Sequence, residues 1–387
     1  MKLNLFIAFY LFTGVLIYAQ VNELDFRSVT VNEDLNFDGY ELIDTMDKQL
    51  FVLAEHWHNI QKAPEATLKL LKYLHKEANL RILAIEQGES VAFMINNYLE
   101  SGDTTLLKQI TRNTLFWGKE NRQFFVDLRN FNLSIPESEQ ISIWSVDIEY
   151  KMASAIFVIN ELIADKEIPS SLHETVGAFQ FLFQDTKTHR EQYDGLAVMY
   201  YYDRDLVEAL ILKTLNDLET SSEEYISYFG DDFVQFATLI LEMDDGLTFD
   251  YTNPNTNYKF RDRLIYKKTI ELVEANPDVG VLCVIGMRHA TKGSSMRKLN
   301  ELSFSPLFGR VTTIRISALY NKLITSSDLK RFHFNYPEQL RSNPATLIRH
   351  DPDDSALKSS KDFDYTLFIN STGNLTPFEK VYTEVDN

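Results

Sequence analysis

The chain has 387 residues, of which 44% are apolar and 24% charged, and its formal net charge at pH 7 is −18. These proportions are ordinary for a folded globular protein, so they exclude a mostly disordered chain, a collagen-like chain and a multi-span membrane protein. The excess of acidic side chains would repel phosphate backbones, which argues against a nucleic acid as partner.

The beginning of the chain has the pattern of a secretory signal peptide. Lys2 precedes an apolar stretch at residues 3–18, and Ala19 supplies a small residue before a cleavage point. The apolar stretch is shorter than the roughly 20 residues of a membrane-spanning helix. We therefore expect residues 1–19 to be removed and the mature chain to be exported, to the periplasm or out of the cell, without a stable membrane span.

Beyond residue 48, short apolar runs typical of buried strands alternate with segments in which apolar residues recur at helical spacing. In the segment 64–78, Leu68, Leu71 and Leu74 share one face, and Pro64 lies in the first turn, where proline is tolerated. The patterns up to residue 146 predict, in chain order, a strand at 49–54, a helix at 64–78, a strand at 81–85, helices at 89–99, 104–112 and 120–131, and a strand at 141–146.

From residue 151 to about 250, long amphipathic segments follow one another without a convincing strand, and this pattern predicts a helical insertion. The alternation of strands and helices elsewhere predicts an α/β fold over residues 20–387, with a central, largely parallel sheet flanked by helices. The remaining patterns are a helix at 258–275, strands at 279–285, 311–318 and 363–369, and a polar, irregular segment at 320–360.

The only cysteine, Cys283, lies in the apolar run 281–285. One cysteine excludes a disulfide within the chain and any site that needs several cysteine ligands for zinc or an iron–sulfur cluster. We expect a buried thiol without a chemical role.

Titratable side chains stand where four of the predicted strands end. Glu55 and His58 follow the first strand, Glu86 the second, Asp147 the third, and His289 the fourth. In parallel sheets ligands bind beyond the carboxyl ends of the strands. The sequence therefore predicts that these side chains surround one crevice.

Each of these side chains also has an ordinary structural explanation. Glu55 and His58 could belong to a polar surface loop, Glu86 could cap the following helix, and His289 could be a structural histidine. Together they favour a site, because unrelated strand ends rarely all finish in titratable residues. Strand alternation sends His56 and His58 to the same face, so the residues leave open which imidazole is active. No phosphate-binding loop, Gly-x-Ser-x-Gly or His-Glu-x-x-His motif supports a kinase, dehydrogenase, serine hydrolase or zinc protease.

Several short motifs follow one another in a characteristic order. They are Glu55-His56-Trp57-His58, Ile85-Glu86, Ile95-Asn96-Asn97-Tyr98, Trp117, Leu128-Arg129-Asn130-Phe131-Asn132, Ser145-Val146-Asp147, Arg261-Asp262, His289 and Phe363-Asp364. This ordered set resembles the erythromycin esterase family. The chain departs from the family at Ala54, where the family has glycine, and at Gly286 and Met287, where it often has His-Asn. Its Gly-Met-x-His is similar to the related TraB/Tiki and haem-binding lipoprotein branches.

The resemblance implies a hydrolase that cleaves an ester or lactone in a small-molecule substrate by means of an activated water. His58, three residues after the first glutamate, would be the general base, and Glu55 or Glu86 would orient its imidazole. His289 would polarise the carbonyl or protonate the leaving group. No cofactor is required on this hypothesis. The residues expected to bind substrate or to support the catalytic groups are Trp117, Arg129, Asp147, Arg261 and Asp262.

Two alternatives stay open at this point. The side chains of Glu55, His58, Glu86 and His289 are also a plausible ligand set for a divalent metal, which would activate the water instead. The other alternative is a protein that binds haem or another small ligand without turnover.

Overall fold

The computed structural model describes residues 21–24, 37–55, 58, 60–113, 116, 118–149, 152–164, 166–184, 187–189, 199–201, 204–248, 254–291, 294, 296, 298–299, 305–318, 345–350 and 362–369. The expected signal peptide at 1–19, together with His56, Trp57 and Trp117, lies outside the described residues. Within the described ranges, no helix combines the length and apolarity that a membrane crossing requires.

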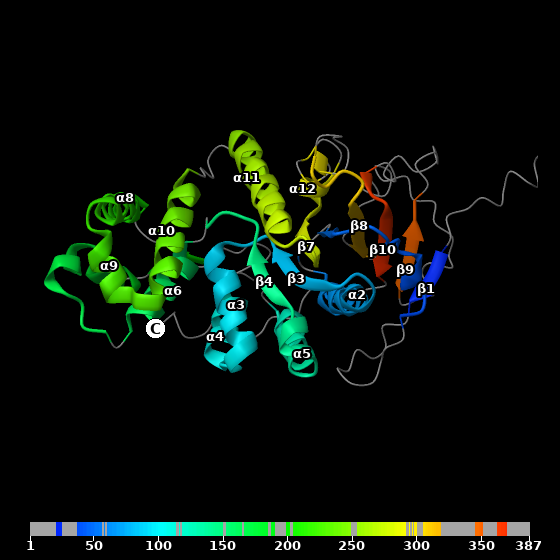
Figure 1. Cartoon of the computed structure of the whole chain (residues 1–387), viewed down its shortest axis with the longest axis horizontal. Coiled ribbons are helices and arrows are strands. Elements are labelled where there is room, and N and C mark those ends of the chain that lie inside the picture. Colours follow the sequence, from blue (N-terminus) through cyan, green and yellow to red (C-terminus); the bar gives the residue numbers. More distant parts are fainter. Residues whose placement is uncertain are drawn as a thin grey trace, which may run out of the picture.

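Within the described residues, eight strands form one sheet in the order β1-β9-β10-β8-β2-β7-β3-β4 (Figure 1). From β10 to β4 every neighbouring pair is parallel, whereas β9 runs antiparallel to both β10 and β1. The predicted α/β class with a largely parallel sheet is therefore confirmed. The strands are β1 (Val21–Leu24), β2 (Leu50–Glu55), β3 (Leu80–Ile85), β4 (Ser142–Ser145), β7 (Gly280–Gly286), β8 (Val311–Ala318), β9 (Ala345–Arg349) and β10 (Tyr365–Ile369).

Helices cover both faces of the sheet, as Figure 1 shows with α11 on one side and α2, α3 and α5 on the other. Because side chains alternate along a strand, Phe51 and Leu53 of β2 join the core under α2, α3 and α5. Val52 and Ala54 join the core under α11. The helices flanking the sheet are α2 (Ala63–Glu77), α3 (Glu89–Ser101), α4 (Thr104–Asn113), α5 (Lys119–Leu133), α11 (Pro254–Ala275) and α12 (Met287–Ala290).

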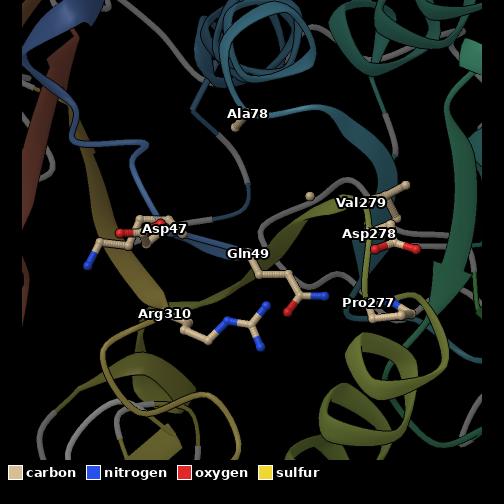
Figure 2. A pocket seen from close by; sticks show the side chains of 9 residues that line it. Asp47, Gln49, Ala78, Pro277, Asp278, Val279 and Arg310 are labelled. Atoms are coloured by element: carbon tan, nitrogen blue, oxygen red, sulfur yellow. The ribbon is translucent and has the colours of Figure 1, made fainter.

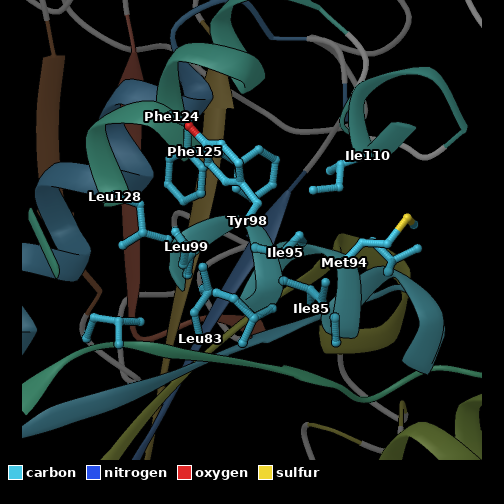
Figure 3. Close-up of a cluster of buried hydrophobic side chains, with 14 of the residues drawn as sticks. Leu83, Ile85, Met94, Ile95, Tyr98, Leu99, Ile110, Phe124, Phe125 and Leu128 are labelled. Atoms are coloured by element: carbon cyan, nitrogen blue, oxygen red, sulfur yellow. The ribbon is translucent and has the colours of Figure 1, made fainter. Parts of the chain in front are cut away.

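The larger core holds in place β3, the strand that directly precedes Glu86. Figure 3 shows Leu83 and Ile85 of β3 among Ile95 and Leu99 of α3 and the α5 residue Leu128. Each such side chain stabilises the fold by about 1.5–3 kcal/mol when fully buried. The end of β3 is therefore anchored on a rigid scaffold.

Between β4 and α11 the chain forms a group of helices that lies beyond the β4 edge of the sheet (Figure 1). Two three-residue strands, β5 (Lys187–His189) and β6 (Met199–Tyr201), pair antiparallel in this region. Neither strand was predicted from the sequence, because three residues are too few for an alternating pattern to be recognised. The helices are α6 (Met152–Ile163), α7 (Ala178–Gln184), α8 (Arg204–Thr220), α9 (Ser222–Phe229) and α10 (Phe233–Leu247).

The outer strands β1 and β9 also differ from expectation, because no strand was predicted at 21–24 and the segment 320–360 was predicted to be irregular. Both are short, so neither carries a long apolar run. Their pairing joins parts of the chain that are far apart, with Val21 opposite Ile348. Pairing of this kind depends on the assembled sheet rather than on local pattern.

Candidate active site

Adjacent parallel strands bring the predicted catalytic residues to one edge of the sheet. In the register of β2 and β7, Glu55 lies opposite Gly286. Glu86 follows the end of β3, and its backbone N–H donates to the carbonyl of Val284 on β7. Helix α12 begins directly after Gly286 and carries His289. The structure thus brings the carboxyl ends of β2, β7 and β3 together, as the sequence predicted.

His58 is paired with Glu55 through one ring nitrogen, and its other nitrogen faces the crevice. Nδ1 of His58 lies 2.9 Å from Oε2 of Glu55. A Cβ atom placed on Gly286 would lie 3.4 Å from Nε2 of His58 and 3.1 Å from Oε2 of Glu86. The imidazole nitrogen and the Glu86 carboxylate therefore both lie close against Gly286, where any larger side chain would crowd them.

The pKa of His58 is raised above its ordinary value of 6.5. Burial lowers the pKa, but the hydrogen bond to Glu55 and the negative charges of Glu55 and Glu86 outweigh burial. The side chain is nevertheless 37% exposed, so it remains within reach of a ligand in the crevice.

Glu86 is a buried carboxylate surrounded by donors. Its Oε1 accepts a hydrogen bond from Nη2 of Arg261 at 2.7 Å and lies 3.4 Å from Nε2 of His289. Its Oε2 accepts a hydrogen bond from the backbone N–H of Gly286. Burial alone would raise the pKa of Glu86, but the hydrogen bond with His289 and the charge of Arg261 hold it well below its usual range. Glu86 is therefore a fixed negative charge at neutral pH.

His289 is buried between two carboxylates. Its Nδ1 lies 3.1 Å from Oδ1 of Asp262, while Nε2 faces Glu86. Burial lowers the pKa of the imidazole, but the hydrogen bonds to Asp262 and Glu86 raise it above its ordinary value. Because both nitrogens face acceptors, the surroundings favour the protonated ring.

Arg261 connects Glu86 to Asp147. Its Nε donates to Oδ1 and Oδ2 of Asp147 at 2.8 and 3.1 Å, and its Nη2 donates to Oδ2 as well as to Glu86. Asp147 is fully buried and also accepts the backbone N–H of Ile148 at 2.9 Å. A two-point guanidinium–carboxylate pair of this kind fixes the orientation of both partners.

Helix α11 contributes two residues that the sequence analysis missed. The ring of Tyr258 stacks on the imidazole of His289, with 4.8 Å between ring centroids and an interplanar angle of 22°. Nζ of Lys268 donates to the backbone carbonyl of Asp147 at 2.8 Å and to the carboxylate of Glu242. Tyr258 lies three and four residues before Arg261 and Asp262, so helical spacing from that motif would have indicated it.

A cavity of about 30 Å³ lies in the crevice. This space exceeds the roughly 10–15 Å³ that one water molecule needs. The residues that line it are Glu55, His58, Ala63, Pro64, Glu86, Gln87, Phe116, Asn121 and Val284. Its wall combines the titratable side chains of Glu55, His58 and Glu86 with apolar ones such as Phe116 and Val284.

A larger groove of about 270 Å³ lies at the opposite, amino-terminal ends of the strands (Figure 2). Its walls include Gln49, Val279 and Arg310, which stand directly before β2, β7 and β8. The sequence analysis placed no candidate residue at these amino-terminal strand ends. The groove is therefore separate from the predicted crevice.

Arg129, which was expected to support the catalytic groups, lies away from them. Its Nη2 lies 3.4 Å from the carbonyl of Glu100, at the carboxyl end of α3. Because Glu86 precedes the other end of this 13-residue helix, the two sites are about 20 Å apart. The contact is typical of a basic side chain at a helix carboxyl terminus.

The described donors do not fit a divalent metal. In the part of the chain that the structure describes, no three His, Cys, Asp or Glu side chains are grouped to hold one metal ion. Both carboxylate oxygens of Glu86 already accept N–H groups, from Arg261 and Gly286.

No family model and no curated protein matches the sequence. Solved structures do match it. A protein from Bacillus cereus aligns with a TM-score of 0.62 at 16% identity, over 94% of this chain and 97% of that chain. An erythromycin esterase mutant in its open conformation aligns with a TM-score of 0.57 at 13% identity, over 86% and 94%. A succinoglycan biosynthesis protein aligns with a TM-score of 0.58 at 12% identity, over 92% and 96%. These likenesses show a shared fold and a structural relationship to an erythromycin esterase.

Proposed function

We propose that the protein is a hydrolase that cleaves an ester or lactone with a water molecule activated by His58. One observation carries the proposal. Nδ1 of His58 is bound to Glu55, while Nε2 lies beside Glu86 and Gly286, and His58, Glu55 and Glu86 line the same cavity. An imidazole that is oriented by a carboxylate and lines a cavity is the arrangement that general-base catalysis requires.

In the first step, the water oxygen attacks the carbonyl carbon while Nε2 of His58 takes its proton. Glu55 orients the ring through Nδ1 and stabilises the imidazolium that forms. The hydrogen bond between the two side chains supports this role. A positioned general base of this kind contributes about 10²–10⁴-fold to the rate.

In the second step, the tetrahedral intermediate collapses, the bond to the leaving oxygen breaks, and His289 supplies a proton to that oxygen. The carboxylates of Glu86 and Asp262 favour the protonated form of His289, which supports its role as acid. Glu86 is itself held ionised by Arg261, so it acts as a fixed charge and does not exchange protons. Arg261 and Asp147 position Glu86.

The structural neighbours support the proposal only at the level of the fold. One is called an erythromycin esterase, and another is called a succinoglycan biosynthesis protein. The same fold thus occurs in proteins that are named for different activities. The proposed activity therefore depends on the residues of the crevice. Trp117 stays a predicted substrate contact, and ligand binding without turnover stays the alternative prediction.

Export is part of the proposal. The apolar stretch that follows Lys2 and ends before Ala19 supports a cleaved signal peptide. The hydrolase would then meet its substrate in the periplasm or outside the cell. Mass measurement of the secreted protein tests this, with loss of about residues 1–19 as the expected result.

The hydrolase proposal is tested with a panel of aryl esters and macrocyclic lactones, with and without a chelator. Wild-type protein should hydrolyse at least one of them, and chelator should not change the rate. His58→Gln should lower turnover by about 10²–10⁴-fold, whereas His173→Gln, a change in an exposed histidine, should leave it unchanged. Absence of turnover across the panel, or full loss with chelator, contradicts the proposal.

A further inference from the structure

Tyr258 lies on α11 and touches two consecutive residues of α12. Its ring stacks on the imidazole of His289, at 4.8 Å between centroids. The guanidinium carbon of Arg288 lies 4.9 Å from the centroid of the same ring. One aromatic ring thus contacts the proposed acid and a neighbouring cation.

The other described contacts of His289 are made at its ring nitrogens. Asp262 and Glu86 lie 3.1 and 3.4 Å from the two ring nitrogens. Contacts at the nitrogens restrain the tilt of the ring less than a contact on its face does. The stacked face of Tyr258 restrains this tilt, and an aromatic face also attracts a positively charged partner.

We propose that the ring of Tyr258 is the positioning element that holds the His289 imidazole with Nδ1 toward Asp262 and Nε2 toward Glu86, and that favours its protonated form. The catalytic consequence rests on the proposed function, whereas the effect on His289 itself does not.

The hydroxyl of Tyr258 can be removed without removing the ring, so an experiment can test the two parts separately. This hydroxyl is buried and has no hydrogen-bond partner within the described part of the chain. Burial raises the pKa of the phenol, with a further contribution from the charge of Asp262, so the hydroxyl stays neutral. Phenylalanine therefore keeps the stacking face and removes an unpaired polar group, whose burial is unfavourable.

The charged groups that surround His289 come from several elements, and the test keeps all of them. They are Arg261 and Asp262 on α11, Glu86 after β3, Arg288 on α12 and, farther off, His58 after β2. A change at Tyr258 removes no formal charge. Any shift in the titration of His289 therefore reports the loss of the ring.

The experiment measures the titration and the tautomer of His289 by ¹⁵N NMR in histidine-labelled protein, with His289→Gln to assign its signals. Tyr258→Phe should titrate like the wild type and melt at the same or a higher temperature. Tyr258→Leu should move the midpoint down by about half a unit to one unit. If Tyr258→Leu does not fold, Tyr258→Met supplies the same comparison.

Tyr228→Leu is the matched control. Tyr228 is also half-buried, has a buried hydroxyl with no partner within the described residues, and packs on Phe229 at 4.9 Å between ring centroids. It lies on α9, in the insertion, so its loss should leave the titration of His289 unchanged.

On an ester substrate, Tyr258→Leu should lower kcat/KM by about tenfold and shift the alkaline limb of the pH profile downward, while Tyr258→Phe should not. An unchanged His289 titration in Tyr258→Leu overturns the inference, and so does a loss in Tyr258→Phe as large as in Tyr258→Leu. If the titration shifts as expected but no variant or wild type hydrolyses any ester, the hydrolase proposal fails and the Tyr258–His289 coupling stands.

Discussion

Nε of Arg261 donates to Oδ1 of Asp147 at 2.8 Å, although the two residues are separated by 114 positions in the chain. This pair joins the end of β4 to α11 and also holds Glu86 through the second arm of the guanidinium. The position of Glu86 therefore depends on a charge pair outside the crevice.

Replacing Arg261 by Gln should destabilise the protein by about 3–5 kcal/mol, because the buried carboxylate of Asp147 would lose its partner. Urea unfolding at pH 7 measures the change. The matched control is Arg263→Gln, an exposed position on the same helix, which should cost no more than about 0.5 kcal/mol. Equal effects of the two changes would show that the Arg261–Asp147 pair does not stabilise the fold.

His58→Gln should lower kcat by about 10²–10⁴-fold with unchanged circular dichroism, because the general base is lost. His56→Gln should cost much less and act mainly on KM. If turnover survives in His58→Gln but disappears in His56→Gln, His56 is the general base.

The acid limb of the kcat/KM profile should have its midpoint above 6.5, because the general base acts only when neutral and the pKa of His58 is raised. Activity should therefore fall as pH decreases through that midpoint. Glu55→Gln removes the negative charge that opposes the effect of burial on the pKa of His58, so the midpoint should move to lower pH. Glu137→Gln, an exposed change on another segment, should leave it in place. A profile that does not respond to Glu55→Gln would exclude this pair from catalysis.

Gly286→Ala should reduce activity by about tenfold while leaving stability nearly unchanged. The added Cβ would lie 3.1 Å from Oε2 of Glu86 and 3.4 Å from Nε2 of His58, so both groups must move by a few tenths of an ångström. The backbone at Gly286 has φ −59, which alanine adopts without strain. Gly177→Ala is the control, since its Cβ would meet only an ordinary contact at 3.8 Å. Full activity in Gly286→Ala would show that this space takes no part in the reaction.

Glu149 should make the protein less stable as pH rises from about 4.5 to 7. Its carboxyl is buried and accepts the N–H of Ser90 at the start of α3, and burial raises its pKa from 4.5 to about 7. Between these values the folded chain keeps a proton that the unfolded chain has lost, so unfolding becomes easier by up to about 3 kcal/mol.

Glu149→Gln should remove that slope and raise the melting temperature at pH 8, as thermal unfolding from pH 4 to 8 would show. Glu271→Gln, an exposed change on α11, should preserve the slope of the wild type. A slope that persists in Glu149→Gln would assign it to another group.

Most of the site could be predicted because its residues directly follow buried strands. Apolar runs and helical spacing locate β2, β3 and β7, and parallel strands necessarily end at one edge. Glu55, Glu86 and His289 were found in this way. Tyr258 was missed although its helical spacing from Arg261 and Asp262 indicates it. Lys268 was missed because a lysine on an amphipathic helix has no pattern that separates it from an ordinary surface position.

The sequence by itself determined the α/β class, the central strands and the polar groups at their ends, because these depend on local periodicity. Only the tertiary structure decided which charges meet. In the folded chain Arg261 binds Asp147 and Glu86, and Arg129 contacts the carboxyl end of α3. The strands β1 and β9 join the sheet. Such contacts join segments up to hundreds of residues apart, and their geometry follows from packing of the whole chain rather than from any one stretch of it.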